Sequence, residues 1–415
     1  MPTVRPFTGY VVASERLQDV VAPAYDALTP AQRHRHAELH PDNYVNAMRS
    51  LEEFPEDQRP SLDELLERNK KKLEDLLAQG AFREVAEPCL FVYRLRTDDH
   101  EQVGLVCEIP VDEYDRGIVK KHEYTQTSRE DHLARYNDVV GAASSPVCLT
   151  YAHRPEINVI ADACMKGAPL IDFVAEDGVA QSIWCIDDRD KHERLRRCFA
   201  EVGEAYLTDG HHRAAAASRF AQLRREQNEH HTGEEAYNYL LVVLFPDDQM
   251  RILAYNRYVK DLNGLSVDEF LAALSRGFEV ECLGDISPEQ AEPAGPREFS
   301  MLLRDKWYRL AVDPDTVPEN DPVGTLDITI LHDRILDPVL GVADLRTDER
   351  CESIAGALGM KGLTERCGIR DGVAFACYPM SIQQLMNVAD AGRAMPPKST
   401  WFDPKVRSGI FLRLR

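Results

Sequence analysis

The segment 209–213, which reads Asp-Gly-His-His-Arg, constrains the fold of this chain more than any other stretch. It follows the apolar residues 205–207 and precedes a strongly helical run over 214–227. This order predicts a strand, a tight glycine turn and the start of a helix. The first N–H groups of a helix have no partner within the helix, and the helix dipole adds partial positive charge there. Because Gly210 lets the backbone approach a ligand closely, the segment predicts an anion site.

Each side chain of segment 209–213 has a predicted role in phosphate chemistry. Arg213 can grip a phosphate through two parallel hydrogen bonds. Either His211 or His212 can stabilise charge that develops on a transferred group. Asp209 can cap the helix, hold a metal ion or accept a proton. A plainer alternative stays open, in which Asp209 is only an N-cap and the two histidines pack against a sheet.

A second polar cluster covers residues 120–125, ahead of a helix predicted over 129–140. In a functional interpretation Glu123 is a general base or a Mg²⁺ ligand, and basic residues around it neutralise phosphate charge. The alternative is an exposed polar loop that leads into a capped helix. The residues that we expect to contact a nucleotide are Lys121 and His122 of this cluster and Arg135 of the helix after it.

A third cluster covers residues 395–405 and contains two adjacent prolines, Pro396 and Pro397. Prolines restrict the backbone, so the polar residues after them are expected to be held with little freedom and to donate to a phosphate or a carboxylate. The alternative is a stiff surface turn whose aromatic residues fill the core. The candidate binding residues of this loop are Lys398, Ser399 and Thr400.

Apolar spacing along the chain predicts a mixed α+β protein of the broad α/β class. Residues 61–79 have the pattern of an amphipathic helix, and residues 89–95 and 103–111 read as paired strands. Residues 239–245 are apolar without alternation, which predicts a strand buried on both faces. Residues 252–259 read as one further strand.

The length of 415 residues is enough for two or three domains. We expect an N-terminal region, 1–260, that holds the phosphate-binding core, and an α+β C-terminal region, 261–415, that contributes the third cluster. Lys and Arg number 49 against 70 Asp and Glu, a net charge of −21. This acidic balance argues against nucleic acid as a partner.

No apolar stretch approaches the roughly 20 residues that span a bilayer, so we expect no membrane association. The first residues lack the apolar core of a signal peptide, which favours a cytoplasmic location. The 10 cysteines are scattered without a Cys-x-x-Cys pair, a pattern typical of reduced thiols and not of a disulfide framework.

The three clusters, in this order and at these spacings, resemble a widespread prokaryotic family known as domain of unknown function 1015. The likeness covers nearly the whole chain, and its motifs are jointly specific. They are Arg5-Pro6-Phe7, Ala22-Pro23-Ala24-Tyr25-Asp26, Lys121-His122-Glu123 with Thr125, Asp209 to Arg213, and Pro397-Lys398-Ser399-Thr400 with Pro404-Lys405.

The Asp-Gly-His-His-Arg turn also resembles the nucleotide-phosphate turn of the ParB/sulfiredoxin superfamily. One branch of it, the ADP-dependent free serine kinases, carries the same five residues. The resemblance implies a ParB/sulfiredoxin-like core with an additional α+β region after it. It also implies ADP or ATP at the helix start, with Mg²⁺ bridging the phosphates and Asp209 and Glu123 as candidate metal ligands. In those kinases a glutamate near the substrate hydroxyl is the base, and we assign that role to Glu123.

The leading hypothesis is a phosphotransferase, a small-molecule kinase, whose partners are a nucleotide and a small hydroxylated metabolite. The resemblance favours L-serine or O-phosphoserine, and so a place in serine metabolism. Glu123 or Asp209 takes the hydroxyl proton, and Lys398 steers the carboxylate of the acceptor. One alternative is a phosphatase of phosphoserine-like esters, and another is a non-enzymatic ParB-like nucleotide-binding regulator. The sequence leaves the oligomeric state open, a homodimer included.

Overall fold

The computed structural model describes residues 1–367 and 372–415, which form two compact units. The predicted boundary lies after residue 260, whereas the contacts divide the chain after Met250 and return its last segment to the first unit. The reason is that β19 (Phe411–Leu414) pairs with β1 (Phe7–Val12). Unit 1 comprises Met1–Lys120, Tyr124–Met250 and Pro404–Arg415, and unit 2 comprises Lys121–Glu123 and Arg251–Asp403.

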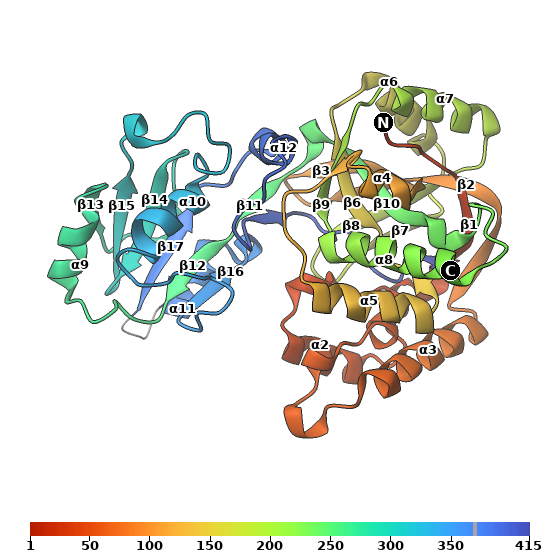
Figure 1. The fold of residues 1–415 in the computed structure, drawn as a ribbon, viewed down its shortest axis with the longest axis horizontal. Coiled ribbons are helices and arrows are strands. Elements are labelled where there is room, and N and C mark those ends of the chain that lie inside the picture. The colour runs from red at the N-terminus through yellow and green to blue at the C-terminus, as the bar shows by residue number, and fades with distance from the viewer. Residues whose placement is uncertain (368–371) are drawn as a thin grey trace. The chain divides into compact units, whose positions relative to one another are not determined.

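Unit 1 is built on a mixed β-sheet with helices packed against it (Figure 1). Most neighbouring strands are antiparallel, while β10 runs parallel to β6 and β4 runs parallel to β9. In order across the sheet the strands are β4 (Val119–Lys120), β9 (Ala205–Asp209), β6 (Val147–Tyr151), β10 (Tyr239–Pro246), β3 (Glu101–Pro110), β2 (Phe82–Arg96), β1, β19 and β5 (Ala142–Ala143). In addition, β8 (Ala180–Ile186) pairs with β2, and β7 (Ile171–Val174) pairs with β8.

Both faces of this sheet are covered, as the apolar pattern predicts. Alternate residues of β10 belong to two separate apolar clusters, with Leu241 and Val243 in one and Val242 and Leu244 in the other. Successive side chains of a strand point to opposite faces of its sheet. Because each set of side chains packs in an apolar cluster, both faces of the sheet are buried at β10. The predicted doubly buried strand and the predicted pairing of β2 with β3 are therefore confirmed.

The helices of unit 1 follow their predicted signals closely. The helix predicted over 61–79 is α3, which begins after Ser61; the side chains of Ser61 and Glu64 form a capping box there. α5 packs alongside α8, the helix that follows segment 209–213. The helices are α1 (Leu17–Val20), α2 (Pro30–Leu39), α3 (Leu62–Ala78), α4 (Val111–Asp115), α5 (Thr127–Val139), α6 (Pro155–Met165), α7 (Arg189–Ala200) and α8 (His211–Gln227).

Unit 2 has its own antiparallel sheet and a short two-stranded ribbon. The predicted strand over 252–259 is divided between them: β11 (Ile252–Ala254) pairs with β18 (Thr400–Phe402) in the ribbon, and β12 (Asn256–Val259) joins the sheet. The sheet order is β13 (Glu279–Gly284), β15 (Lys306–Ala311), β14 (Glu298–Leu303), β17 (Val373–Cys377), β12 and β16 (Cys351–Ile354). The helices are α9 (Val267–Leu274), α10 (Asp327–Leu331), α11 (Gly359–Cys367) and α12 (Ile382–Asp390).

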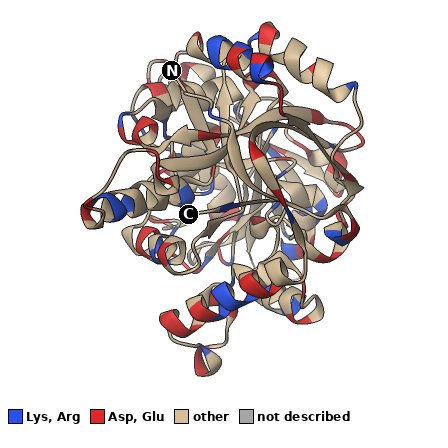
Figure 2. Ribbon diagram, turned by 90° about the vertical axis from the view of Figure 1, so that its right-hand side faces the viewer, with Lys and Arg blue, Asp and Glu red and all other residues tan. Residues whose placement is uncertain are grey.

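The predicted mixed α/β class is confirmed, with 38% helix and 26% strand in several sheets. Acidic and basic residues are interspersed along the helices and loops drawn in Figure 2. Within the described part of the chain, the structure contains no helix with the length and apolar character needed to cross a membrane.

Candidate functional site

The predicted strand, turn and helix at residues 209–213 are present in unit 1. β9 ends at Asp209, Gly210 has a φ of 97°, and α8 begins at His211, which is buried. A φ in this range strains any residue that has a Cβ, so the turn requires a glycine. Gly210 is the N-cap of α8. The alternative in which Asp209 is only a helix cap is therefore wrong.

Asp209 lies between two cations. Its Oδ1 accepts a hydrogen bond from Lys405 Nζ at 3.0 Å, and its Oδ2 accepts one from Arg213 Nη2 at 2.5 Å. Burial by itself raises the pKa of this carboxyl, but the charges of Lys405 and Arg213 outweigh that effect and hold the pKa well below its usual range. Asp209 is therefore a charged anchor for two cations and a poor acceptor of a proton.

Arg213 braces the glycine turn against the entry to β6. Its Nη1 donates to the backbone carbonyls of Ser145 at 2.9 Å and Pro146 at 2.8 Å. Together with the bond to Asp209, these contacts use three of the five N–H donors of a guanidinium. The others are the donors with which Arg213 can contact a phosphate in the predicted role.

Lys405 connects two carboxylates that come from distant parts of unit 1. Its Nζ lies 3.0 Å from Asp209 Oδ1 and 3.8 Å from Asp26 Oδ2, and only 13% of its side chain is exposed. Sequence reasoning missed both Lys405 and Asp26 as site residues. The available signal was their presence in two motifs that carry the family resemblance, Ala22–Asp26 and Pro404–Lys405.

The residue that precedes α5 donates a hydrogen bond from its backbone to a side chain at the start of α8. Gln126 N–H donates to His212 Nε2 at 3.2 Å, and this geometry assigns the ring proton to Nδ1, because Nε2 acts as the acceptor. Arg135, on α5, is half exposed and pairs with Asp138 at 3.3 Å and Asp63 at 3.5 Å. The predicted phosphate role of Arg135 stays a prediction.

The second and third clusters come together within unit 2. Met395 N–H donates to the His122 carbonyl at 2.8 Å, which places Lys121–Glu123 against the start of the third cluster. The predicted site residues thus divide between the two units. Unit 1 holds Asp209, Gly210, His211, His212, Arg213 and Arg135, and unit 2 holds Lys121, His122, Glu123, Lys398, Ser399 and Thr400.

The backbone of the third cluster is held by hydrogen bonds from side chains. Arg257 is fully buried, and its Nη2 donates to the carbonyls of Pro397 at 3.2 Å and Lys398 at 2.9 Å. Ser399 Oγ donates to the Pro396 carbonyl at 2.6 Å. Lys398 has a φ of 56°, a left-handed conformation that is uncommon outside glycine. A buried guanidinium and two prolines therefore fix this loop, and its role in binding stays a prediction.

The surroundings of Asp209 do not fit a Mg²⁺ ligand. Both of its oxygens face cations, and the Lys405 ammonium contacts Asp26 as well, so it supplies the positive charge that a divalent ion would bring. Within the ranges that the structure describes, no group of three or more His, Cys, Asp and Glu side chains is arranged to hold a metal ion. We therefore assign no metal to Asp209, and the metal role of Glu123 stays a prediction.

Replacing Gly210 by alanine is expected to destabilise unit 1 and to weaken anion binding. An alanine here must adopt the φ of 97°, which adds backbone strain of about 1–2 kcal/mol. Its Cβ would lie 2.9 Å from Arg213 Nη2, so the guanidinium is displaced. Gly178→Ala is the matched control, because Gly178 has a φ of 82° and its Cβ meets no described atom within 4 Å. Chemical denaturation compares the two, and an equal loss in both variants contradicts the importance of the Arg213 contact.

Comparisons with known proteins give a family and several distant structures. The profile of the family described as "Protein of unknown function (DUF1015)" matches residues 4–329. No curated protein matches the sequence. One similar solved structure is a C-terminally truncated SbnI from Staphylococcus aureus, with 12% identity, a TM-score of 0.38 and coverage of 73% of this chain and 85% of that chain. A mutant free serine kinase in complex with ADP has 13% identity, a TM-score of 0.35 and coverage of 72% of this chain and 87% of that chain. A conserved hypothetical protein from Pyrococcus furiosus has 14% identity, a TM-score of 0.35 and coverage of 73% of this chain and 93% of that chain.

Proposed function

The chain belongs to the DUF1015 family of proteins of unknown function, and since this membership assigns no activity, we propose from the site itself that the protein is a phosphotransferase. In this proposal it is a small-molecule kinase that moves a phosphoryl group between a nucleotide, ADP or ATP, and a small hydroxylated metabolite. The observation that carries the proposal is the placement of Lys405 and Arg213 around Asp209 at the first turn of α8.

This arrangement supports phosphoryl transfer because that reaction depends mostly on positioning and on neutralising charge. A long helix that starts directly after a left-handed glycine offers N–H groups and partial positive charge to a phosphate. Lys405 and Arg213 add two full charges, and Asp209 keeps both in place. In the proposal they hold the donor phosphates, and His211 or His212 stabilises charge on the transferred group.

L-serine is the first acceptor to test, because segment 209–213 resembles the nucleotide-phosphate turn of the free serine kinases. Glu123 as the base and Lys398 as the group that steers the acceptor's carboxylate are further parts of the proposal. They are tested by Glu123→Gln, which lowers kcat if Glu123 is the base, and by Lys398→Met, which should raise the KM for serine.

Phosphorus NMR on the purified protein tests the proposal. The sample contains O-phosphoserine, ADP and MgCl₂ as the nucleotide's counterion, and a second sample contains L-serine and ADP. New ATP, or AMP together with phosphoserine, supports the kinase. Inorganic phosphate released equally without ADP overturns it in favour of a phosphatase. Broadened or shifted nucleotide signals without turnover, across a panel of hydroxylated acceptors, overturn it in favour of a nucleotide-binding regulator.

A further inference from the structure

Asp26 is the second carboxylate that Lys405 contacts, and it is open to solvent. It is the middle residue of a short turn, its Oδ2 lies 3.8 Å from Lys405 Nζ, and 46% of its side chain is exposed. The segment ahead of the turn is tied to the segment that carries Lys405, because Ala22 N–H donates to the Ser408 carbonyl at 2.9 Å. The contact between Asp26 and Lys405 is therefore built into unit 1, and the Asp26 carboxylate is accessible to solvent.

One arginine holds the backbone on both sides of Asp26. Arg33 Nη1 donates to the carbonyls of Tyr25 at 3.3 Å and Leu28 at 2.7 Å, and its guanidinium lies 3.9 Å from the centre of the Tyr25 ring. The Tyr25 hydroxyl is itself hydrogen-bonded to Ser50 Oγ at 3.0 Å. These contacts fix the residue before Asp26 and the residue at the end of its turn, so they set where the carboxylate can lie.

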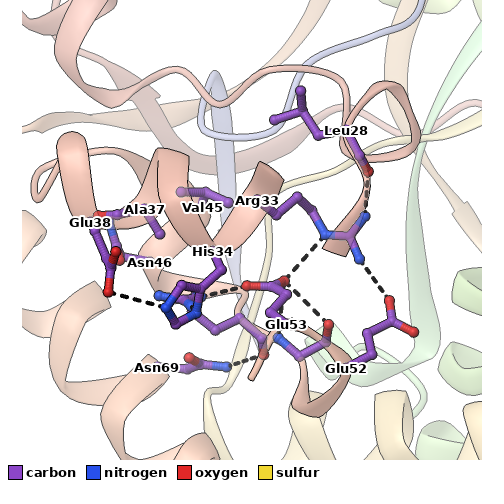
Figure 3. Close-up of polar contacts among 12 residues, drawn as sticks. Leu28, Arg33, His34, Ala37, Glu38, Val45, Asn46, Glu52, Glu53 and Asn69 are labelled. Atoms are coloured by element: carbon purple, nitrogen blue, oxygen red, sulfur yellow. Dashed lines mark hydrogen bonds and ion pairs between the residues drawn. The ribbon is translucent and has the colours of Figure 1, made fainter. Parts of the chain in front are cut away.

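Arg33 is held in turn by a buried carboxylate, Glu53 (Figure 3). The side chain of Glu53 is 0% exposed, and it accepts hydrogen bonds from Arg33 Nε at 3.3 Å and Arg49 Nε at 2.5 Å. Arg49 Nη2 also contacts His34 Nδ1 at 2.8 Å. Burying such charges is costly, and apolar residues of similar size often give equal stability. A function in fixing geometry therefore accounts for this network better than a gain in stability does.

We propose that Asp26, in place of Glu123, receives the proton of the acceptor hydroxyl and that the network of Arg33, Glu53 and Arg49 positions it for this step. The inference rests on the phosphotransfer proposed above. Asp209 is unsuited to the task, because both of its oxygens face cations. Asp26 contacts the Lys405 ammonium, which holds the phosphate in the proposed reaction. The proposed proton acceptor and the phosphoryl group therefore both lie next to Lys405.

The step balances without a further reactant. The acceptor's O–H bond breaks as its oxygen bonds to the terminal phosphorus of the nucleotide, and the proton passes to a carboxylate oxygen of Asp26. The bridging P–O bond breaks, and its electron pair leaves with the nucleotide, whose new charge Lys405 and Arg213 neutralise. With ADP as the donor the products are AMP and a phosphate ester, and in the reverse direction Asp26 returns the proton.

The test compares kcat and KM of the wild type with those of Asp26→Asn, Asp26→Glu and the matched control Asp42→Asn. Asp42 is 43% exposed and contacts a lysine of unit 1, Lys72, at 3.1 Å. We expect Asp26→Asn to lower kcat about 100-fold or more, the usual contribution of a proton-transfer group. The KM for the nucleotide should stay close to the wild-type value, Asp26→Glu should recover part of kcat, and Asp42→Asn should leave both constants near wild type.

Each result decides between the two proposals. Unchanged kcat in Asp26→Asn, with Glu123→Gln inactive, overturns the role of Asp26 and leaves the kinase proposal in place. A rise in KM alone, or no recovery in Asp26→Glu, reduces Asp26 to a structural residue and also overturns the inference. A wild-type protein that transfers no phosphoryl group defeats the proposed function itself, and this outcome is recognised before any variant is compared.

Discussion

Replacing Lys405 by methionine is expected to lower kcat/KM for phosphoryl transfer about 1,000-fold, the effect of removing a group aimed at developing charge. Methionine keeps the length of the side chain and removes the ammonium. The Lys405 ammonium lies 3.8 Å from Asp26 and 3.0 Å from Asp209. Without it, the two carboxylates repel an incoming phosphate. Steady-state kinetics measures the loss, and titration with inorganic phosphate measures the weakened anion binding independently of turnover.

Lys72→Met is the matched control for this prediction. Asp42 lies between Lys72 and Arg16, at 3.1 Å from each, just as Asp209 lies between Lys405 and Arg213. Lys72 is 19% exposed, close to the 13% of Lys405. The control should keep nearly full activity and phosphate binding. If both methionine variants lose phosphate binding to the same degree, the loss reflects damage to unit 1 and not a function of Lys405.

Replacing Glu53 by alanine is expected to lower the free energy of unfolding of unit 1 by about 3–5 kcal/mol, because it leaves two arginines without their shared carboxylate. Arg33 and Arg49 are 5% and 11% exposed, so water solvates them poorly once the carboxylate is gone. Native-state hydrogen exchange on amides of β2 and β10 measures the opening free energy of unit 1 without interference from unit 2.

Glu52→Ala is the control within the same network. Glu52 Oε1 accepts from the same Arg33, at 2.7 Å, but 48% of its side chain is exposed, so its loss should cost less than about 1 kcal/mol. A loss in Glu53→Ala no larger than in Glu52→Ala contradicts the view that Glu53 is the organising carboxylate. If the network positions Asp26, Glu53→Ala should also lower kcat under conditions in which the variant is fully folded.

Local patterns predicted most of the framework around segment 209–213. The glycine turn, the pairing of β2 with β3 and the doubly buried β10 all follow from side-chain periodicity and from residues that favour turns. The division of residues 252–259 into β11 and β12 did not, because their partners, β18 and β17, lie more than a hundred residues further along the chain. Periodicity identifies a strand but says nothing about the sheet that it joins.

Only part of the candidate site was predicted, because sequence patterns again identify neighbours along the chain and not distant partners. Asp209, Gly210 and Arg213 are neighbours in sequence, and their chemistry is visible in the motif. Lys405 lies 196 positions from Asp209, and no local rule links a lysine after a proline to that carboxylate. Sequence spacing also could not show that both oxygens of Asp209 face cations, and these contacts make Asp209 the weaker of the two expected bases, Glu123 and Asp209.

Unit 1 is interrupted by unit 2, and this arrangement sets the order in which the protein can mature on the ribosome. Residues 1–250 emerge first but lack β19 and Lys405, which follow residues 251–403. At the usual rate of synthesis that inserted segment takes roughly 8–30 s to make. Through this interval β1 has an unpaired edge, and Asp26 and Asp209 lack their shared cation. The nascent chain therefore exposes a strand edge of the kind that chaperones protect, and Lys405 joins Asp26 and Asp209 only with the last residues of unit 1.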